Sequence, residues 1–383
     1  GAFDYTGVYK MTVATSDPEA ALSFVTKYLS ATEKAQPHPG GDGTCALVKW
    51  ALFPGSEYQM HFVNTFQKPQ GDWTLTEYGE YMDDLHRGVV GIDAFMNNRV
   101  KLFFTDLDGV VEKLQEGGEE LRVFRNAGDG TYSVMALVPT GVVIECVGSL
   151  SEDSLAQLEI MEWSFCSLDS VSSLTSRHLT AAADLDDGVW PLAAVYAVSD
   201  GNSTAEFFTE VLSASLASEA RTDDDCANIY VLDIPGTESQ LGYTYQVHLV
   251  DAPLSPSGTL KVSDYEDYLN NLHGDIQDLD NDHYDSYMDN HIGLYIESGD
   301  DVINELQSLD IPFFTRCNGG STCYANVTET SSVAEGLEGD DFTADVFLQV
   351  GNTGIIYEVL GPVSEDILEE GFTQWDLCGP NFT

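Results

Sequence analysis

Basic residues are scarce in this chain of 383 residues, which has 15 Lys and Arg against 64 Asp and Glu. The formal net charge of −49 repels phosphate backbones and anionic lipid surfaces, so we expect no nucleic-acid partner. No stretch of 18 or more apolar residues occurs, and we therefore expect no membrane-spanning helix. A phosphate-binding glycine loop and a nucleophile elbow are also missing, which argues against two common classes of enzyme.

Apolar residues make up 43% of the chain, enough for sizeable cores, and the length exceeds that of one ordinary domain. The acidic surface suits a salty or cation-rich medium, in which Ca²⁺ bridges carboxylates on acidic loops. The Asp-rich run at 275–290 loosely resembles a calcium loop, although His283 stands where the sharp turn needs Gly. A solvated acidic surface without a specific partner is the alternative interpretation.

An internal repeat organises the chain. "YQMHFVN" at 58–64 nearly matches "YQVHLVD" at 245–251, with His61 and His248 at equivalent places. His86 and His273 follow these strands at the same spacing, so the repeat extends well beyond one strand. We therefore predict two homologous domains, at 1–166 and 188–383, joined by a Ser-, Thr- and Ala-rich linker at 167–187.

Each half reads as strands and helices in a repeated order. "VYKMTVAT", "CALVKWALF" and "YQMHFVN" alternate like strands, and "DPEAALSFVTKYLSA" has helical spacing behind an Asp cap and a Pro. The order restarts at "RVKLFFTD", followed by the helical "LDGVVEKLQEGG" and three further strands. We predict an α+β fold of two tandem domains, each made of two β-α-β-β-β modules with mixed sheets.

This order, with phrases such as "SDGNSTAEFFTEVLSA" and "HIGLYIESGDDVINELQSLDIPFF", resembles the vicinal oxygen chelate superfamily of glyoxalase I, bleomycin-resistance proteins and extradiol dioxygenases. The resemblance covers nearly the whole chain, and its two-domain form is similar to the extradiol and hydroxyphenylpyruvate dioxygenases. It implies cups of curled strands that hold a metal through His or Glu on the first, fourth, fifth and eighth strands of a domain.

In the second half these places hold Ala193, His248, His291 and Glu358. The resemblance thus implies a divalent metal, Fe, Mn or Zn, bound by His248, His291 and Glu358. Ala193 departs from the family pattern, because the dioxygenases take a histidine from that first strand. The alternative is that both histidines line the strands and make structural hydrogen bonds.

In the first half the same places hold Lys10, His61, Arg99 and Glu145. This degenerate cup resembles one in which side-chain charge replaces the charge of a metal. We expect no metal there. Because His61 persists without a metal, its counterpart His248 has packing and hydrogen bonding as an alternative role.

Seven cysteines bear on the compartment. If equivalent cysteines of the repeat form the same bridge in each half, and a local bridge closes "CNGGSTC", the disulfides are Cys45–Cys166, Cys226–Cys378 and Cys317–Cys323. Cys146 is left over, and we expect it to be buried. Free thiols in a cytosolic protein are the alternative.

Three sequons, at Asn202, Asn326 and Asn381, lie where surface glycans are expected in a secreted protein. We therefore predict an acidic, glycosylated protein, extracellular or at the cell surface, that uses the duplicated fold as a structural or binding unit. Self-association into a coat or filament belongs to this hypothesis. The alternative is a metal-dependent dioxygenase or glyoxalase-like enzyme with the His248, His291 and Glu358 site.

Overall fold

The computed structural model describes most of the strand and helix segments of the chain. The described residues are 2–15, 17–34, 47–64, 99–126, 130–138, 143–162, 187–218, 228–251, 291–317, 342–351, 353, 355–364 and 373–374. Among the helices of these segments, none has the length and apolar character needed to cross a membrane.

Four modules follow one another along the chain, each a strand, a helix and three further strands. The first comprises β1 (Tyr5–Ala14), α1 (Pro18–Tyr28), β2 (Thr32–Lys34), β3 (Leu47–Leu52) and β4 (Gln59–Asn64). The second comprises β5 (Arg99–Phe104), α3 (Leu107–Gly117), β6 (Leu121–Arg125), β7 (Tyr132–Leu137) and β8 (Val143–Gly148), followed by α4 (Glu152–Leu155) and β9 (Ile160–Glu162).

The second half repeats this order. Its modules comprise β10 (Val189–Val198), α6 (Gly201–Glu210), β11 (Ser215–Ser218), β12 (Asn228–Ile234), α7 (Glu238–Leu241) and β13 (Tyr245–Asp251), then β14 (His291–Ile296), α9 (Gly299–Ser308), β15 (Phe313–Cys317), β16 (Phe342–Gln349), β17 (Ile356–Val363) and β18 (Thr373–Gln374). The predicted α+β class and the four β-α-β-β-β modules are confirmed.

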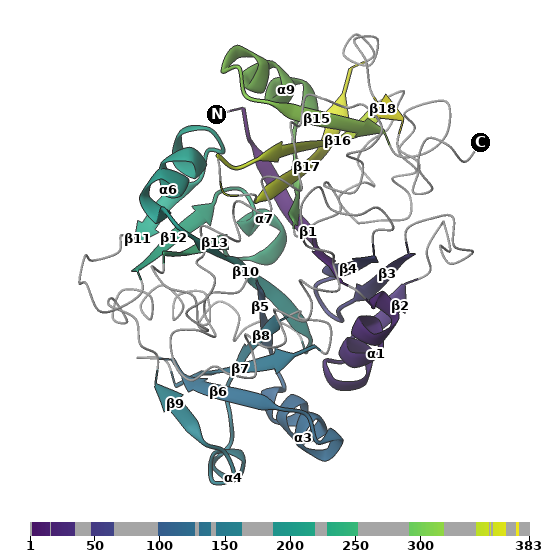
Figure 1. The fold of residues 1–383 in the computed structure, drawn as a ribbon, viewed down its shortest axis with the longest axis vertical. Helices are drawn as coiled ribbons and strands as arrows, with labels where there is room; N and C mark the ends of the chain where they lie inside the picture. The colour runs from purple at the N-terminus through teal and green to yellow at the C-terminus, as the bar shows by residue number, and fades with distance from the viewer. Residues whose placement is uncertain are drawn as a thin grey trace, which may run out of the picture.

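The modules pair in an order that the repeat does not reveal. The first and fourth modules form one sheet, which we call the terminal sheet, with strand order β18-β15-β16-β17-β14-β1-β4-β3-β2. The second and third form the central sheet, with order β11-β12-β13-β10-β5-β8-β7-β6-β9. In Figure 1 the purple β1 accordingly runs beside the green and yellow strands of the last module.

Antiparallel strand pairs join the modules at the middle of each sheet. β1 pairs with β14, so that Lys10 faces Gly293, and β10 pairs with β5, so that Ala193 faces Lys101. Each sheet therefore takes one module from each half of the chain. The predicted linker lies almost entirely outside the described residues, and the domain boundary at 167–187 stays a prediction.

Helix ends follow the capping signals in the sequence. Asp17, Asp106 and Asp200 each accept a hydrogen bond from a backbone N–H in the first helical turn that follows. The helix predicted from "LDGVVEKLQEGG" ends at Gly118, which has a left-handed φ of 70°. These caps fix where each helix starts against its sheet.

A repeated Pro-Gly turn connects the two sheets. The turn after β3 contacts the start of β10, where Val189 N–H donates to the Pro54 carbonyl at 2.8 Å. The equivalent turn in the second half follows β12 and contains Gly236, which has a φ of +89°. A Cβ at Gly236 would lie 2.0 Å from the carbonyl oxygen of Tyr5 on β1. A side chain at position 236 is thus excluded twice, by backbone conformation and by space. Buried apolar residues of both sheets form one continuous core.

Candidate functional site: two polar cups

Each sheet carries a cluster of buried ionisable residues near its central strands. In the terminal sheet, the cluster consists of the buried Lys10 on β1, His291 on β14 and Glu358 on β17, with the half-buried His61 on β4. Lys10 and Glu358 both lie in register with Gly293, and Thr12 lies in register with His61 and His291. We call this cluster the terminal cup.

Glu358 is the centre of the terminal cup and is 0% exposed. One of its oxygens, Oε2, lies 2.8 Å from Lys10 Nζ and 2.6 Å from His291 Nε2. The other, Oε1, accepts a hydrogen bond from the hydroxyl of Tyr9 at 2.5 Å. Burial and the negative charge of Glu358 raise the pKa of Tyr9 well above its ordinary value, so Tyr9 stays protonated and acts as the donor.

His61 is held from two sides. Its ring stacks on the indole of Trp50, with ring centroids 4.6 Å apart and planes 7° apart, and its Nε2 lies 3.1 Å from Gln59 Oε1. Desolvation in the cup and the positive charge of Lys10 lower the pKa of His61 well below its ordinary value. His61 is therefore a neutral imidazole.

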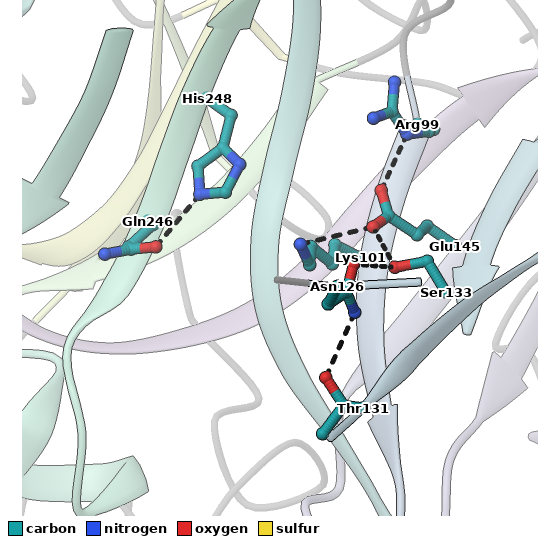
Figure 2. A network of polar contacts seen from close by, with 8 residues as sticks. All are labelled: Arg99, Lys101, Asn126, Thr131, Ser133, Glu145, Gln246 and His248. Atoms are coloured by element: carbon teal, nitrogen blue, oxygen red, sulfur yellow. Dashed lines mark hydrogen bonds and ion pairs between the residues drawn. The ribbon is translucent and has the colours of Figure 1, made fainter. Parts of the chain in front are cut away.

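The central sheet carries the second cluster, the central cup, around Glu145 on β8 (Figure 2). Arg99 Nε donates to Glu145 Oε2 at 2.9 Å, and Lys101 Nζ lies 3.2 Å from Oε1. The Ser133 hydroxyl also donates to Oε1, at 2.8 Å. Burial alone would raise the pKa of Glu145, but Lys101 and Arg99 outweigh it and hold that pKa at about 2.

A short polar network supports Glu145 from β7. Ser133 Oγ also lies 3.2 Å from Asn126 Oδ1, and Asn126 Nδ2 donates to the Thr131 hydroxyl at 3.1 Å. All three residues are buried, so the Asn126–Thr131 and Ser133–Glu145 hydrogen bonds pair groups that would be costly to leave unpaired. The Ser133 Oγ to Asn126 Oδ1 contact is not one of these bonds, because the single hydroxyl proton of Ser133 goes to Glu145. No repeat or motif in the sequence marks Asn126, Thr131 or Ser133, so the sequence gives no signal by which to identify them.

His248 lies on the other side of the central cup, on β13 (Figure 2). Gln246 Nε2 donates to Asp233 at 2.8 Å, which leaves Gln246 Oε1 to accept from His248 Nε2 at 2.9 Å. This chain of contacts places a proton on His248 Nε2. The same Gln-x-His contact recurs at Gln59 and His61, so the repeated strand preserves a hydrogen-bonded pair.

The structure divides the predicted ligand set between the two cups. His291 and Glu358 meet in the terminal cup, whereas His248 lies in the central cup. The predicted degenerate set is divided in the same way: Lys10 and His61 belong to the terminal cup, Arg99 and Glu145 to the central cup. The physical reason is the pairing of β1 with β14 and of β10 with β5, which joins modules from opposite halves.

The metal that the family resemblance implies does not fit either cup as it is arranged. In the terminal cup, the ammonium of Lys10 lies against the same Glu358 oxygen that would ligate the ion. In the central cup, Arg99 and Lys101 neutralise Glu145. Within the described segments, no group of three His, Cys, Asp or Glu side chains is arranged to hold a metal ion. A divalent cation would have to displace a fixed positive charge in each case.

Other residues named from the sequence fall partly within the described segments. Asn202 is exposed in the first turn of α6, and its side-chain amide donates to Glu206 at 2.8 Å. Cys146 is a buried free thiol, as predicted. Several predicted features lie outside the described residues: the sequons at Asn326 and Asn381, the acidic run at 275–290, His86 and His273. The predicted disulfides also lie outside them, except for Cys317 at the end of β15.

Comparison with known proteins finds similarity only among solved structures. No family model matches the chain, and no curated protein matches it. A putative dioxygenase from Bacillus subtilis is 10% identical, with a TM-score of 0.48, over 97% of this chain and 93% of that one. Glyoxalase I from Zea mays is 10% identical, with a TM-score of 0.44, over 95% and 94% of the two chains.

Shorter structures match part of the chain. A mutant of the fosfomycin resistance protein FosX from Listeria monocytogenes, complexed with Mn(II) and a dihydroxypropylphosphonic acid, is 14% identical, with a TM-score of 0.26. The match covers 39% of this chain and 97% of that one. At such identities the likeness concerns the fold alone. The order of strands and helices is the one predicted from the sequence.

Proposed function

We propose that this protein uses its duplicated glyoxalase-like fold as a structural or binding unit and does not carry out metal-dependent catalysis. The observation that supports the proposal most directly is the pairing of Glu358 with Lys10 and His291 through a single carboxylate oxygen. An ammonium 2.8 Å from that oxygen supplies the positive charge that a metal would bring, without offering open coordination positions to a substrate.

The setting we propose is extracellular, with the protein glycosylated and able to self-associate. The net charge of −49 and the exposed position of Asn202, the first residue of a sequon, support this setting. Leu216 and Leu309 are the exposed large hydrophobic residues among the described segments. Leu216 lies on β11 and Leu309 follows α9. We propose that cations bridging acidic surfaces drive assembly into a coat or filament.

Elemental analysis of protein purified from its native source without chelator tests the proposal. We expect no stoichiometric iron, manganese or zinc, and the same result for recombinant wild type and His291→Ala. One equivalent of a transition metal that is lost in His291→Ala would overturn it. The setting is tested separately, by the mass lost on enzymatic removal of N-glycans and by light scattering with Ca²⁺ and with chelator.

The alternative, a metal-dependent dioxygenase or glyoxalase-like enzyme, is favoured by one feature of the terminal cup. In the terminal sheet, the four places from which the family takes its ligands fall on β1, β4, β14 and β17. Three of them hold possible metal ligands: His61, His291 and Glu358. Two imidazoles and one carboxylate suit Fe²⁺, Mn²⁺ or Zn²⁺. This candidate predicts that Lys10 moves away when metal binds, and that turnover of catechols or dicarbonyls depends on the metal.

A further inference from the structure

A buried amine and a buried carboxylate from opposite halves of the chain meet in the terminal cup. Lys10 Nζ on β1 lies 2.8 Å from Glu358 Oε2 on β17, and the two side chains are 6% and 0% exposed. Taking two such charges out of water costs free energy that their mutual attraction can fail to offset. A reaction that consumes both charges at once would therefore stabilise this part of the protein.

Two further groups contact the Glu358 carboxylate where amide formation needs them. The Tyr9 hydroxyl donates to Oε1 at 2.5 Å, and burial together with the charge of Glu358 raises the pKa of Tyr9, so the donor keeps its proton. His291 Nε2 lies 2.6 Å from Oε2, the oxygen that Lys10 also contacts. One oxygen thus has a fixed hydrogen-bond donor, and the other lies beside both the amine and an imidazole that can transfer protons.

The other ionisable groups near the pair do not enter the reaction. Desolvation and the charge of Lys10 lower the pKa of His61, which is a neutral imidazole. The negative charge of buried Asp345 contributes to the raised pKa of Tyr9, and Asp345 lies in register with the basic residue Arg316 on β15. Amide formation removes one positive and one negative charge together, so it leaves the charge balance of the cup unchanged.

The central cup holds a similar pair that serves as a comparison. Lys101 Nζ lies 3.2 Å from Glu145 Oε1, but Arg99 also contacts Glu145, and a guanidinium does not lose its proton in proteins. Lys101 and Arg99 hold the pKa of Glu145 at about 2, so this side chain stays an ionised carboxylate. Because an ionised carboxylate resists attack by an amine, we expect no amide bond in the central cup.

We propose that Lys10 and Glu358 condense to an amide bond that ties β1 to β17. A proton first passes from the Lys10 ammonium to Glu358 Oε2, which leaves a neutral amine against a neutral carboxylic acid. The amine nitrogen attacks the carboxyl carbon, and the Tyr9 hydroxyl stabilises the negative charge that develops on Oε1. His291 passes a second proton from the nitrogen to Oε2, the bond between the carbon and Oε2 breaks, and one water leaves.

The fold supplies what this condensation lacks in water. Well-oriented groups held in contact react at effective concentrations of about 10⁵–10⁸ M, and burial disfavours the ionised forms that keep a free amine and a free acid apart. The bond would join the first and the last module covalently, which goes beyond the proposed function. It would also leave Glu358 without a carboxylate to ligate a metal.

Mass spectrometry of the denatured full chain tests the proposal. Recombinant protein made without glycosylation, with its thiols reduced, should be lighter than its sequence by the mass of one water, and protease digestion should give two peptides joined through Lys10 and Glu358. Lys10→Arg keeps a positive charge but should have the full sequence mass. Lys101→Arg, the same change in the central cup, should keep the mass deficit. Tyr9→Phe removes the donor to Oε1 and should slow the appearance of the deficit.

Wild-type protein that has its full sequence mass, both when fresh and after prolonged incubation, would overturn the proposal. Joined peptides that persist in Lys10→Arg, or that lack either residue of the pair, would do the same. If Lys10→Arg does not fold, the joined peptides of the wild type still decide the matter. The metal content of the same samples separates the two proposals: metal-free protein without the amide contradicts only the amide, whereas stoichiometric transition metal contradicts the proposed function.

Discussion

Replacing Glu145 by Gln tests the electrostatics of the central cup quantitatively. The variant keeps the shape of the side chain but leaves Arg99 and Lys101 without the buried carboxylate that they share. Those two cations hold the pKa of Glu145 at about 2, against an ordinary value of 4.5. The shift corresponds to a stabilisation of about 3 kcal/mol at neutral pH, similar to the cost of breaking a buried ion pair.

The sign of the pH dependence follows from the lowered pKa of Glu145. The stabilisation is complete above the unfolded-state pKa of 4.5 and is lost as the pH falls toward the folded-state pKa of about 2. Urea unfolding followed by circular dichroism should therefore give a difference of about 3 kcal/mol between wild type and Glu145→Gln at about pH 7, shrinking between about pH 4.5 and pH 3. Glu152→Gln, at an exposed site, should change stability little. A difference below about 1 kcal/mol at neutral pH, or one that does not change with pH, would refute the reasoning.

Further substitutions test the two cups and the core. Lys10→Ala removes the ammonium beside Glu358 and should let the terminal cup bind one Mn²⁺ or Zn²⁺, measured by titration calorimetry, which wild type should not. Gln246→Leu should destabilise the fold by about 1–3 kcal/mol in urea unfolding, because His248 and Asp233 both lose a partner. Burial, together with the charge of Glu145, raises the pKa of Cys146 well above its ordinary value, so a thiol reagent should label Cys146 only when the protein unfolds, as peptide mass spectrometry would detect.

Local patterns in the sequence predict the elements of the fold because the forces that form them are local. Asp17 and Asp106 cap helices that begin where apolar residues take up helical spacing, and Gly118 ends one of them. The Gln-x-His pairs also carry a local signal. Residues two apart on a strand point to the same face, so the repeated Gln-x-His pattern predicts a contact between the two side chains.

The composition of the cups depends on contacts between distant parts of the chain. Tyr9 and Glu358, which share a hydrogen bond, are 349 positions apart. A repeat identifies equivalent residues in the two halves but not which modules share a sheet, since either pairing gives the same alternation of buried positions. The sequence therefore indicates cup residues such as His291 and Glu358, whereas their true neighbours, Lys10 and Tyr9, follow only from the pairing of β1 with β14.

The exchange of modules between halves has a consequence for folding. In the intact protein, the first strand of each module pairs with a strand of the other half: β1 with β14, and β5 with β10. A half expressed alone, at 1–166 or 188–383, would therefore expose the edges of its two first strands. Unpaired central strands with buried apolar residues are strong sites of association.

We therefore expect each half alone to aggregate or to pair with a second copy of itself, and the two halves co-expressed to form a one-to-one complex. Size-exclusion chromatography with light scattering distinguishes these species, and urea unfolding shows whether the complex unfolds cooperatively. Two halves that each remain folded monomers would mean that each half closes its own sheet, with Lys10 and Glu358 no longer in one cup. That result would contradict the composition of both cups. The terminal cup pairs Lys10 of the first half with Glu358 of the second. The central cup places His248 of the second half in the same sheet as Glu145 of the first.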